Sequence, residues 1–475
     1  ASGDVLPEFR EFERFSTTVA DAYLGPLMAR YLRSLSQRVE RAGLPEPLVM
    51  QSSGGVMDLG SATFSAASCV LSGPAAGVVG AAHVATSGGF DDVLSLDMGG
   101  TSTDVAPIVG GVVATSTEGN VGGVPIKLPM VDVHTVGAGG GSIAWIDDGG
   151  ALRVGPRSSG ADPGPACYGK GGVEATVTDA NLFLGYMAPD ASLGGAIALD
   201  PELAQRALEK LGHRLDLDAT EVALGIRRVA NAEMTRALRV VSVERGLDPR
   251  AFSLVAFGGA GPLHACALAD ELGLQSVLVP RASGVLSALG LAISDVRRDY
   301  VAPLLGSVSE IDTAELKEGF VRLEALGEAD LGADSRFERR ADLRYHGQSF
   351  ELTVPGHALD ALHARFHDAH EQRFGYRMDE EPVDLVAIRV VARLVVEAPE
   401  LHDEASEEGP RAAIRRANFG GRWIEARVYR RSDLGGGSSM RGPAVVEFDE
   451  STAAVPEGWS GTIDDSGTLI LERAR

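Results

Sequence analysis

The sequence has few cysteines, and their number and spacing limit what the protein can be. Its 475 residues contain three, Cys69, Cys167 and Cys266, which are odd in number and widely separated. That usage favours reduced thiols in the cytosol over a disulfide framework. No CxxC pair and no HExxH motif is present, which argues against a closed structural zinc site. We interpret Cys167 and Cys266 as small core residues.

Long apolar runs and excess positive charge are also missing. No uninterrupted apolar run approaches the ~20 residues that a transmembrane helix needs. The sequence contains 43 Lys and Arg residues and 66 Asp and Glu residues, so its net charge is −23. This balance argues against broad binding to nucleic acid or to an anionic membrane. We expect a cytoplasmic protein whose length suffices for about two to four domains with proper cores.

What the sequence does contain is a polar glycine turn directly after an apolar strand. Residues 94–96 lead into Asp97, and the turn that follows holds two glycines and three hydroxyls before the chain returns as a strand at Val105. Glycine lets backbone N–H groups approach an anion closely, and hydroxyls add further donors. The pattern predicts half of a phosphate and metal clamp; a tight hairpin with solvated polar tips is the alternative. The predicted phosphate contacts are Gly99, Gly100, Thr101 and Ser102.

The carboxylates that flank this turn have candidate roles. Asp97 is placed to hold a divalent cation through water, because Mg²⁺ keeps much of its hydration shell. A turn-capping carboxylate is the alternative for Asp97. Asp104 is either a second acid on the metal side or the partner of a nearby base, and Thr103 favours the returning strand.

A second strand, turn and helix occurs later in the chain. Residues 252–257 form an apolar strand, Pro262 stands at the first position of a helix, and Gly273 ends that helix. A glycine turn at a helix N-terminus forms a platform for an anion or a nucleotide. The candidate nucleotide contacts are Gly258, Gly259 and Gly261, with a simple strand-to-helix turn as the alternative.

A histidine and two aspartates raise further candidates. His134 ends a strand beside Asp132 and precedes the glycine run 137–142, so it could orient a substrate, act as acid or base, or bind metal. A structural histidine is the alternative. The glycine run lacks the full GxGxxG spacing, so a dinucleotide fingerprint fits poorly. Asp162 and Asp179 are either site residues or loop caps.

The remaining pattern indicates the organisation of the chain. Helical spacing of apolar residues predicts helices over residues 16–41 and 221–246. After Tyr300 charge rises and glycine clustering falls. An exposed helix is predicted over residues 310–328, and short strands with glycine and proline turns dominate toward the C-terminus.

Taken in order along most of the chain, these motifs resemble the hydantoinase A / 5-oxoprolinase family, within the actin and sugar kinase superfamily of ATPases. The resemblance implies an α/β fold: actin-like (ribonuclease H-like) ATPase subdomains plus a β-rich α+β C-terminal domain. It implies an ATPase core over residues 1–300, divided into a phosphate lobe at 45–200 and an adenosine lobe at 201–300. A helical connector at 301–340 and the β-rich domain at 341–475 follow. The matching motifs are residues 50–55, 72–77, 97–105, 132–142, 162–169, 176–181, 243–246 and 257–265.

The resemblance also implies an activity. Members open a cyclic amide or imide, of the hydantoin or 5-oxoproline type, with ATP and Mg²⁺ or another divalent metal, and they usually work with a B-type subunit or domain. It implies an oligomeric hydrolase with Asp97, Asp104 and His134 as catalytic residues and Asp97, Asp132 and His134 on the metal. A ketone carboxylase subunit, related by the same activation chemistry, and a non-catalytic nucleotide-binding or scaffold subunit are the alternatives.

One departure from the family pattern matters. Members open with an earlier phosphate loop, a DxGGT-like turn, and no such turn precedes Asp97. The resemblance begins partway through the pattern, near residues 7–14. We therefore expect a truncated chain that, by itself, does not hydrolyse the ring.

Overall fold

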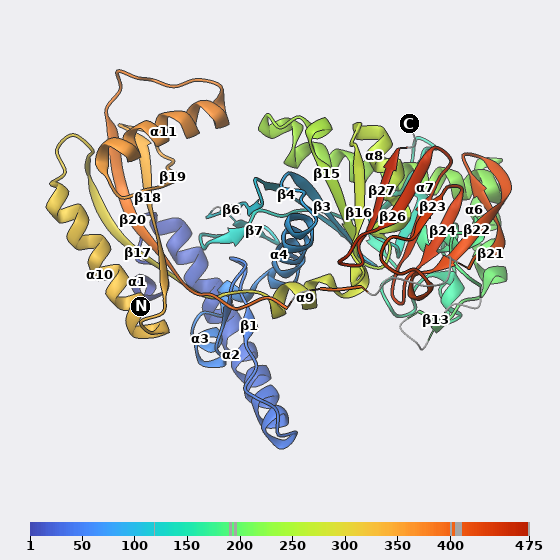
Figure 1. The fold of residues 1–475 in the computed structure, drawn as a ribbon, viewed down its shortest axis with the longest axis horizontal. Coiled ribbons are helices and arrows are strands. Elements are labelled where there is room, and N and C mark those ends of the chain that lie inside the picture. The colour runs from blue at the N-terminus through green and yellow to red at the C-terminus, as the bar shows by residue number, and fades with distance from the viewer. Residues whose placement is uncertain (118, 190–191, 194–196, 400, 404–410, 474–475) are drawn as a thin grey trace. The chain divides into compact units, whose positions relative to one another are not determined.

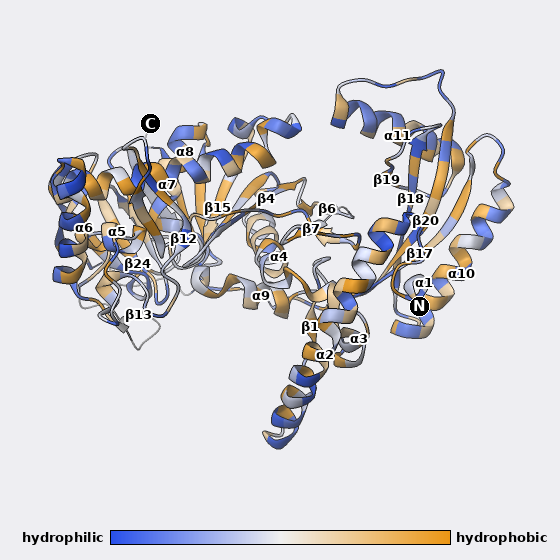
Figure 2. Ribbon diagram, turned by 180° about the vertical axis from the view of Figure 1, so that it is seen from behind, coloured by the Kyte–Doolittle hydropathy of each residue, from blue (hydrophilic) through white to orange (hydrophobic). Residues whose placement is uncertain are grey.

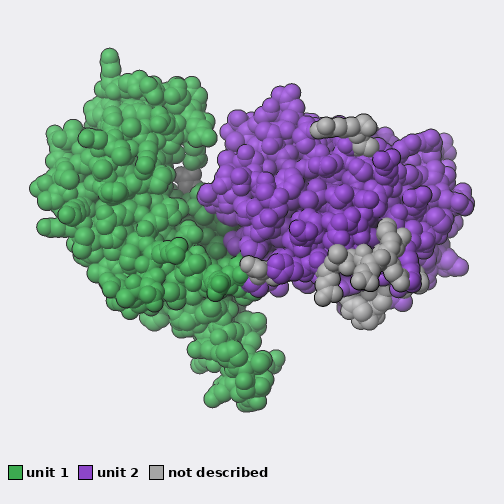
Figure 3. All heavy atoms as spheres, viewed as in Figure 1, with its two compact units in different colours: residues 1–76, 115–131, 291–398 green, residues 77–114, 132–290, 399–475 purple. Residues whose placement is uncertain are grey.

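The computed structural model is a mixed α/β protein that describes residues 1–117, 119–189, 192–193, 197–399, 401–403 and 411–473 (Figure 1). The chain forms two compact units, coloured separately in Figure 3, and each unit is assembled from three separate stretches. The predicted domains are consecutive ranges, and the compact units cut across them. Unit 1 comprises residues 1–76, 115–131 and 291–398, and unit 2 comprises residues 77–114, 132–290 and 399–475.

Unit 1 is built on a sheet with the strand order β1-β2-β17-β20-β18-β19. Its long strand β20 (Val383–Leu394) pairs antiparallel with both β17 (Val296–Ser307) and β18 (Arg336–Tyr345). Helix α10 (Thr313–Leu331) packs along these strands (Figure 1). The other elements are α1 (Ser2–Val5), α2 (Glu11–Arg41), β1 (Val49–Met50), β2 (Val56–Met57), α3 (Leu59–Phe64), β6 (Thr115–Ser116), β7 (Gly119–Val121), β8 (Val124–Ile126), β9 (Met130–Val131), β19 (Leu352–Pro355) and α11 (Leu359–Phe374).

Small residues let α10 approach the sheet closely. Asp312 caps the helix by accepting from the Ala314 N–H group at 2.9 Å. A Cβ added to Gly319 would lie 2.5 Å from the Ile388 side chain, and Gly327 is similarly tight against Phe337. The predicted exposed helix over residues 310–328 is therefore present, and one of its faces is buried against β20.

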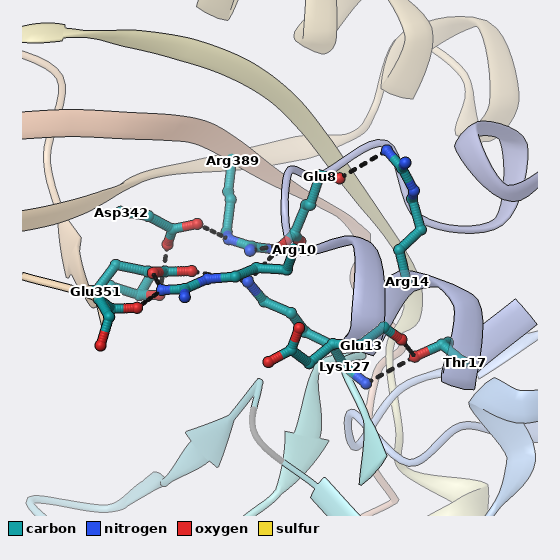
Figure 4. Close-up of polar contacts among 11 residues, drawn as sticks. Glu8, Arg10, Glu13, Arg14, Thr17, Lys127, Asp342, Glu351 and Arg389 are labelled. Carbon is teal, nitrogen blue, oxygen red and sulfur yellow. Dashed lines mark hydrogen bonds and ion pairs between the residues drawn. The ribbon is translucent and has the colours of Figure 1, made fainter.

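A buried network of charges joins three stretches of unit 1 (Figure 4). Arg389 donates to Glu8 at 2.6 Å and to Asp342 at 2.8 Å. Lys127 pairs with Glu8 at 2.8 Å and with Glu351 at 2.7 Å. Burial acts to lower the pKa of Lys127, but the adjacent carboxylates outweigh it and leave that pKa raised. The network thus ties the N-terminal residues of the unit to its sheet.

Unit 2 is built on a larger sheet with the order β10-β4-β3-β15-β16-β27-β26-β23. Strand β15 (Ser253–Phe257) is buried along its whole length, as expected for a parallel strand covered on both faces. Figure 2 shows the apolar character of this strand. The other elements are β3 (Val93–Met98), β4 (Thr103–Val109), β5 (Val112–Val113), β10 (His134–Val136), β11 (Ser142–Ile146), β12 (Leu152–Ser158), α5 (Val177–Phe183), β13 (Ser192–Leu193), β14 (Ile197–Ala198), α6 (Pro201–Leu215), α7 (Ala219–Val241), α8 (Gly261–Leu272), β16 (Ser276–Val279), β23 (Ser439–Arg441), β26 (Trp459–Ile463) and β27 (Leu469–Arg473).

The helices predicted in this part of the chain are confirmed. α7 covers most of the predicted range 221–246, and a 3₁₀ turn at Val243–Arg245 follows it. α8 starts with Pro262 in its first turn and ends at Gly273, which has a φ of +73°. Two further helices, α4 (Ser72–Ser87) and α9 (Leu286–Ala292), contain points where the chain passes from one unit to the other.

The C-terminal part of the chain is rich in strands, as predicted. β21 (Ala413–Phe419), β22 (Arg422–Arg430), β24 (Ala444–Glu447) and β25 (Thr452–Val455) form a sheet of their own. β27 instead pairs with β16, so this part of the chain also extends the main sheet of unit 2. Among the described residues, no helix is both long and apolar enough to cross a membrane.

Candidate functional site

Four strands of unit 2 end at one edge of its main sheet. β3 and β15 run parallel, and β16 runs parallel to β15. β10 and β3 both run antiparallel to β4, so they also point the same way. The turns that follow these strands therefore lie along one edge, the position at which open α/β sheets bind ligands. These turns comprise residues 99–102, 137–141, 258–260 and 280–285.

The two strongest sequence motifs, which the sequence analysis assigned to different lobes, lie side by side on neighbouring strands. Phe257 pairs with Asp97 across the parallel strands, and the Ala260 N–H group donates to the Met98 carbonyl oxygen at 3.0 Å. Both turns belong to unit 2. The two strands are distant in sequence, so only the strand pairing could reveal that they are neighbours.

Two carboxylates face each other next to the first turn. Asp97 pairs directly with Asp104 across β3 and β4, so both side chains lie on one face of the sheet. Burial, and then the charge of Asp104, raise the pKa of Asp97 to about 6. Burial also raises the pKa of Asp104, although the Thr135 hydroxyl donates to it at 2.5 Å and acts in the opposite direction. A cation bound between two such groups would relieve their repulsion.

The glycine run after β10 packs backbone against backbone on the first turn. The Gly140 N–H group donates to the Gly99 carbonyl oxygen at 2.9 Å. A Cβ added to Gly139 would lie only 2.6 Å from the carbonyl carbon of Thr101. Residues 137–141 are therefore glycine-rich because this close approach requires it, and the packing holds the first turn in place.

The first turn itself faces open space. A Cβ added to Gly100 would meet nothing within 4 Å, and one added to Gly99 would meet only the Ser102 carbonyl oxygen, at 4.0 Å. Thr101 is exposed and Ser102 is half-buried. Packing thus does not demand glycine here. The Gly99 N–H group donates to the Ser102 carbonyl oxygen at 3.1 Å, so the donors that the turn can offer an anion are those of residues 100–102.

The third turn combines a required glycine with a helix start. Gly258 has a φ of +76°, and a Cβ on it would lie 2.3 Å from Oδ1 of Asp97 and 2.6 Å from the Met98 carbonyl oxygen. Its N–H group donates to the Ser283 carbonyl oxygen at 2.8 Å. α8 begins at Gly261, so its first N–H groups point toward the same edge of the sheet. The turn brings backbone very close to Asp97.

Asp132 is engaged by an arginine. Both carboxylate oxygens accept hydrogen bonds from Arg245, one of them at 3.1 Å. Within unit 2, the side chain of Arg245 therefore contacts Asp132. Because the pairing uses both oxygens, Asp132 does not present a free carboxylate to the first turn.

His134 lies on the other face of the sheet from the carboxylate pair. It stands opposite Val105, whereas its neighbour Thr135 stands opposite Asp104, and successive side chains of a strand point to opposite faces. Within the described residues, no group of three or more His, Cys, Asp or Glu side chains is placed to hold a metal ion. The structure therefore does not bring Asp97, Asp132 and His134 together as one metal site, and the catalytic role of His134 stays a prediction.

The remaining candidate residues either have structural roles or show no contact with the turns at this edge. The buried Asp179 accepts from the Thr176 N–H group at 2.9 Å and from the Cys167 N–H group at 2.8 Å, so it is a loop and helix cap. Asp162 lies exposed in a loop. Cys167 and Cys266 are buried, and burial raises the pKa of both thiols, in agreement with their interpretation as core residues.

Sequence reasoning did not select two residues at this edge. Thr178 donates both its N–H group and its hydroxyl to the Gly140 carbonyl oxygen, each at 2.8 Å, and so fixes the glycine run. Thr178 lies within motif 176–181, one of the motifs that resemble the family, and that motif is the feature of the sequence that could have pointed to it. Glu450 is exposed beside the third turn, with its carbonyl oxygen 3.6 Å from a Cβ placed on Gly259. Nothing in the local sequence marks Glu450.

This fold and this arrangement of turns are those of an actin-like α/β protein with a β-rich C-terminal part, which confirms the predicted fold class. The chain belongs to the hydantoinase/oxoprolinase family. The model described as Hydantoinase/oxoprolinase matches residues 14–300, and that of the Hydantoinase/oxoprolinase C-terminal domain matches residues 362–474.

Known relatives support this assignment. Caprolactamase subunit alpha from Pseudomonas jessenii is 38% identical over 98% of this chain and 71% of its own length. The crystal structure of the ATP-dependent caprolactamase from that organism covers 100% of this chain and 72% of its own, with 36% identity and a TM-score of 0.87. The 5-oxoprolinase of Saccharomyces cerevisiae is 34% identical over 99% of this chain, which spans only 39% of that enzyme.

A nucleotide-free structure of acetone carboxylase, an enzyme of ATP-dependent acetone carboxylation, also matches. It covers 100% of this chain and 71% of its own, with 26% identity and a TM-score of 0.81. The chain thus spans about 70% of some relatives and well under half of the 5-oxoprolinase of Saccharomyces cerevisiae, and the two solved structures that it matches are ATP-dependent enzymes of different reaction types.

Proposed function

We propose that the chain binds MgATP at the edge formed by turns 99–102, 137–141 and 258–260. We further propose that it serves the ATP-dependent opening of a small cyclic amide or imide, of the hydantoin or 5-oxoproline type. The observation that carries the proposal is the open turn at Gly100, Thr101 and Ser102 directly beside the Asp97–Asp104 carboxylate pair. Each part alone is common, but together they suit phosphates and a divalent cation.

Each part of the edge has a role in this proposal. Asp97 and Asp104 would hold the cation, and the N–H groups and hydroxyls of residues 100–102 would donate to phosphate oxygens. Gly258 lets the third turn approach Asp97, Gly259 and Gly261 are the proposed nucleoside contacts beside it, and the start of α8 adds positive potential. Residues 137–141 and Thr178 keep the first turn in its shape.

The chemistry explains why a ring opener needs ATP. An amide carbonyl is a poor electrophile. Transfer of the terminal phosphoryl group to the amide oxygen breaks the bond to ADP and creates a good leaving group on that carbon. Water then adds to the carbon and the ring C–N bond breaks, which leaves the new amine and an acyl phosphate. A second water hydrolyses the acyl phosphate to the carboxylate and free phosphate, and the amine takes up the released proton. Positioning and charge stabilisation are what the chain must supply.

The relatives favour a reaction on a cyclic amide and the presence of a partner. Caprolactamase and 5-oxoprolinase are named for cyclic amide substrates, and the former is named as one subunit of an enzyme. We therefore propose that this chain works with a hydantoinase B-type subunit or domain. Ketone carboxylation is the second candidate, because the chain also matches acetone carboxylase. Bicarbonate-dependent ATP turnover with a ketone would identify that activity.

The proposal predicts a specific loss in an Asp97→Asn variant. Asparagine keeps the shape but removes the charge that holds the cation, so the Kd for MgATP measured by isothermal titration should rise on the order of ten-fold. Asp148→Asn is the matched control, since Asp148 is an exposed carboxylate of the same unit. Equal affinity in wild type and Asp97→Asn would contradict the nucleotide site.

Ring opening is tested separately from binding. Phosphate release is measured with MgATP, the B-type subunit and 5-oxoproline, hydantoin or caprolactam in turn. Release that depends on one of these rings supports the hydrolase, and release that is independent of every ring excludes it. Binding of MgATP without ring-dependent release in the complete assembly would leave only a nucleotide-binding role.

Affinity for MgATP should also depend on pH in a defined window. The pKa of Asp97 is raised to about 6, so the group is mostly protonated at pH 5 and mostly ionised at pH 7. If the ionised form holds the cation, affinity should increase by about ten-fold from pH 5 to pH 7 and level off above it. ATP titrates in the same range, so the quantity to compare is the ratio of wild-type to Asp97→Asn affinity. A ratio that does not change with pH would exclude Asp97.

A further inference from the structure

Helix α11 of unit 1 carries three histidines on one face. They are His363, His367 and His370, spaced at i, i+4 and i+7, so they lie one above another along the helix. The helix packs against β18 and β19 (Figure 1). His367 and His370 are buried, whereas His363 is only half-buried, so solvent and small ions can reach it. Nothing proposed for the sheet edge of unit 2 uses these side chains.

The first two histidines turn the same ring nitrogen toward each other. The Nε2 atoms of His363 and His367 lie 3.4 Å apart, with the two rings inclined at 69°. A protein N–H group usually lies about 2.7–3.2 Å from its acceptor, so this contact is long for a hydrogen bond. Two nitrogens that bind one tetrahedral metal ion through bonds of about 2.0–2.1 Å lie about 3.3–3.4 Å apart. The pair therefore already has the spacing of two metal ligands.

A hydrogen bond behind His367 fixes the direction of its ring. Its Nδ1 atom lies 2.8 Å from the hydroxyl oxygen of Tyr345, which also accepts from the Met378 N–H group at 2.8 Å. Tyr345 is fully buried, so this oxygen is held in place. When Nδ1 carries the ring proton and donates it to Tyr345, the Nε2 lone pair is free to bind a cation. Histidines that bind metal almost always have such a partner at the other ring nitrogen.

The third histidine of this face is directed elsewhere. Nδ1 of His370 donates to the Tyr376 carbonyl oxygen at 2.8 Å, and its ring packs against Phe350, Phe366 and Phe374. Among the described residues its buried Nε2 atom has no hydrogen-bond partner. In the same part of the chain no three His, Cys, Asp or Glu side chains are placed around one ion. The site thus has two protein ligands, and water completes the coordination.

We propose that His363 and His367 bind a divalent transition-metal ion of the zinc, nickel or copper class. Imidazole nitrogen suits these ions, whereas Mg²⁺ and Ca²⁺ prefer oxygen ligands. The pair belongs to unit 1, and the carboxylates proposed for MgATP belong to unit 2, so the two proposals stand independently. A bound ion joins adjacent turns of α11 and keeps the ring of His367 against Tyr345. It thereby fastens the helix to strand β18.

Isothermal titration of the whole chain with Zn²⁺, in the presence of excess Mg²⁺, measures the affinity. With two ligands in place of the four of a structural zinc site, a Kd on the order of 10 μM is expected. His363→Gln should raise this Kd about ten-fold or more, since it removes one of the two ligands. The half-buried position tolerates this change, which circular dichroism checks. His357→Gln is the matched control, because His357 is an exposed histidine of the same unit outside the pair.

Two further measurements locate the ion. With one equivalent of Cu²⁺ as the probe, electron paramagnetic resonance should show coupling to two ring nitrogens in the wild type and lose this pattern in His363→Gln. Zn²⁺ should slow hydrogen exchange of the α11 amides in the wild type and not in His363→Gln, because the ion ties adjacent turns together. Helix α10 of the same unit contains no histidine and is the internal control.

Four results would overturn the proposal. The first is the absence of saturable Zn²⁺ binding, and the second is equal affinity in the wild type and His363→Gln, which would place the ion on other histidines. The third is binding that excess Mg²⁺ abolishes, which would assign the ion to carboxylates. The fourth is hydrogen exchange in α11 that Zn²⁺ slows no more than it slows exchange in α10.

Discussion

An Arg389→Met variant is expected to lose about 3–5 kcal/mol of the folding free energy of unit 1. Methionine keeps much of the arginine volume but removes the charge that the buried carboxylates of Glu8 and Asp342 share. Glu8 keeps its pair with Lys127, so the unpaired charge falls mainly on Asp342. Hydrogen exchange of the amides in β18 and β20 measures the loss directly in this unit.

Arg377→Met is the matched control for this prediction. Arg377 also lies near several carboxylates of unit 1, among them Asp379 at 3.0 Å, but its side chain is exposed. Exposed ion pairs contribute only ~0–1 kcal/mol, so this variant should be nearly neutral. If Arg389→Met and Arg377→Met lost similar amounts of protection from hydrogen exchange, burial would not be what makes the Arg389 ion pairs stabilise unit 1.

A Gly139→Ala variant should lose detectable MgATP binding and about 1–3 kcal/mol of unit 2 stability. The added methyl group would lie within 2.6–2.7 Å of backbone atoms of Gly100, Thr101 and Ser102, which cannot move aside like a flexible side chain. The first turn must shift to accommodate it, and the phosphate donors shift with it. Stability is followed by the fluorescence of Trp145, Trp423 and Trp459, all of which lie in unit 2.

Gly100→Ala separates the binding role of the turn from its packing. A methyl group there meets no protein atom within 4 Å, so stability should change by less than about 0.5 kcal/mol. If phosphate oxygens approach this backbone, the same methyl group obstructs them and MgATP affinity should fall about ten-fold. Unchanged affinity in Gly100→Ala, together with loss in Gly139→Ala, would move the phosphates away from the first turn.

The sequence predicts the parts of the candidate site that depend on local chemistry. The first turn, the strand and helix around Gly258 and the cap at Gly273 could be read because glycine, proline and hydroxyls act within a few residues. The family likeness then supplied the fold class. The presence of α10 and of α7 likewise follows from the pattern, whereas the burial of one face of α10 against β20 was not predicted.

What depends on strand pairing could not be read in this way. His134 and Asp104 look equally suited to a site, and only the register of β10 on β4 shows that their side chains point to opposite faces. The pairing of Asp132 with Arg245 and the capping role of Asp179 depend on partners that the local pattern does not name. The neighbourhood of Asp97 and Gly258 is set by the parallel pairing of β3 with β15.

The interleaved path of the chain has a consequence for its synthesis. β20 is the central partner of β17 and β18, yet it is the last strand of its sheet to leave the ribosome. Until residues 383–394 emerge, both neighbours present unpaired backbone edges that invite association with other nascent chains. Slower translation of residues 383–394 should therefore lower the yield of soluble protein. The same slowing over the residues of α7 should lower it less, because the hydrogen bonds of a helix are local.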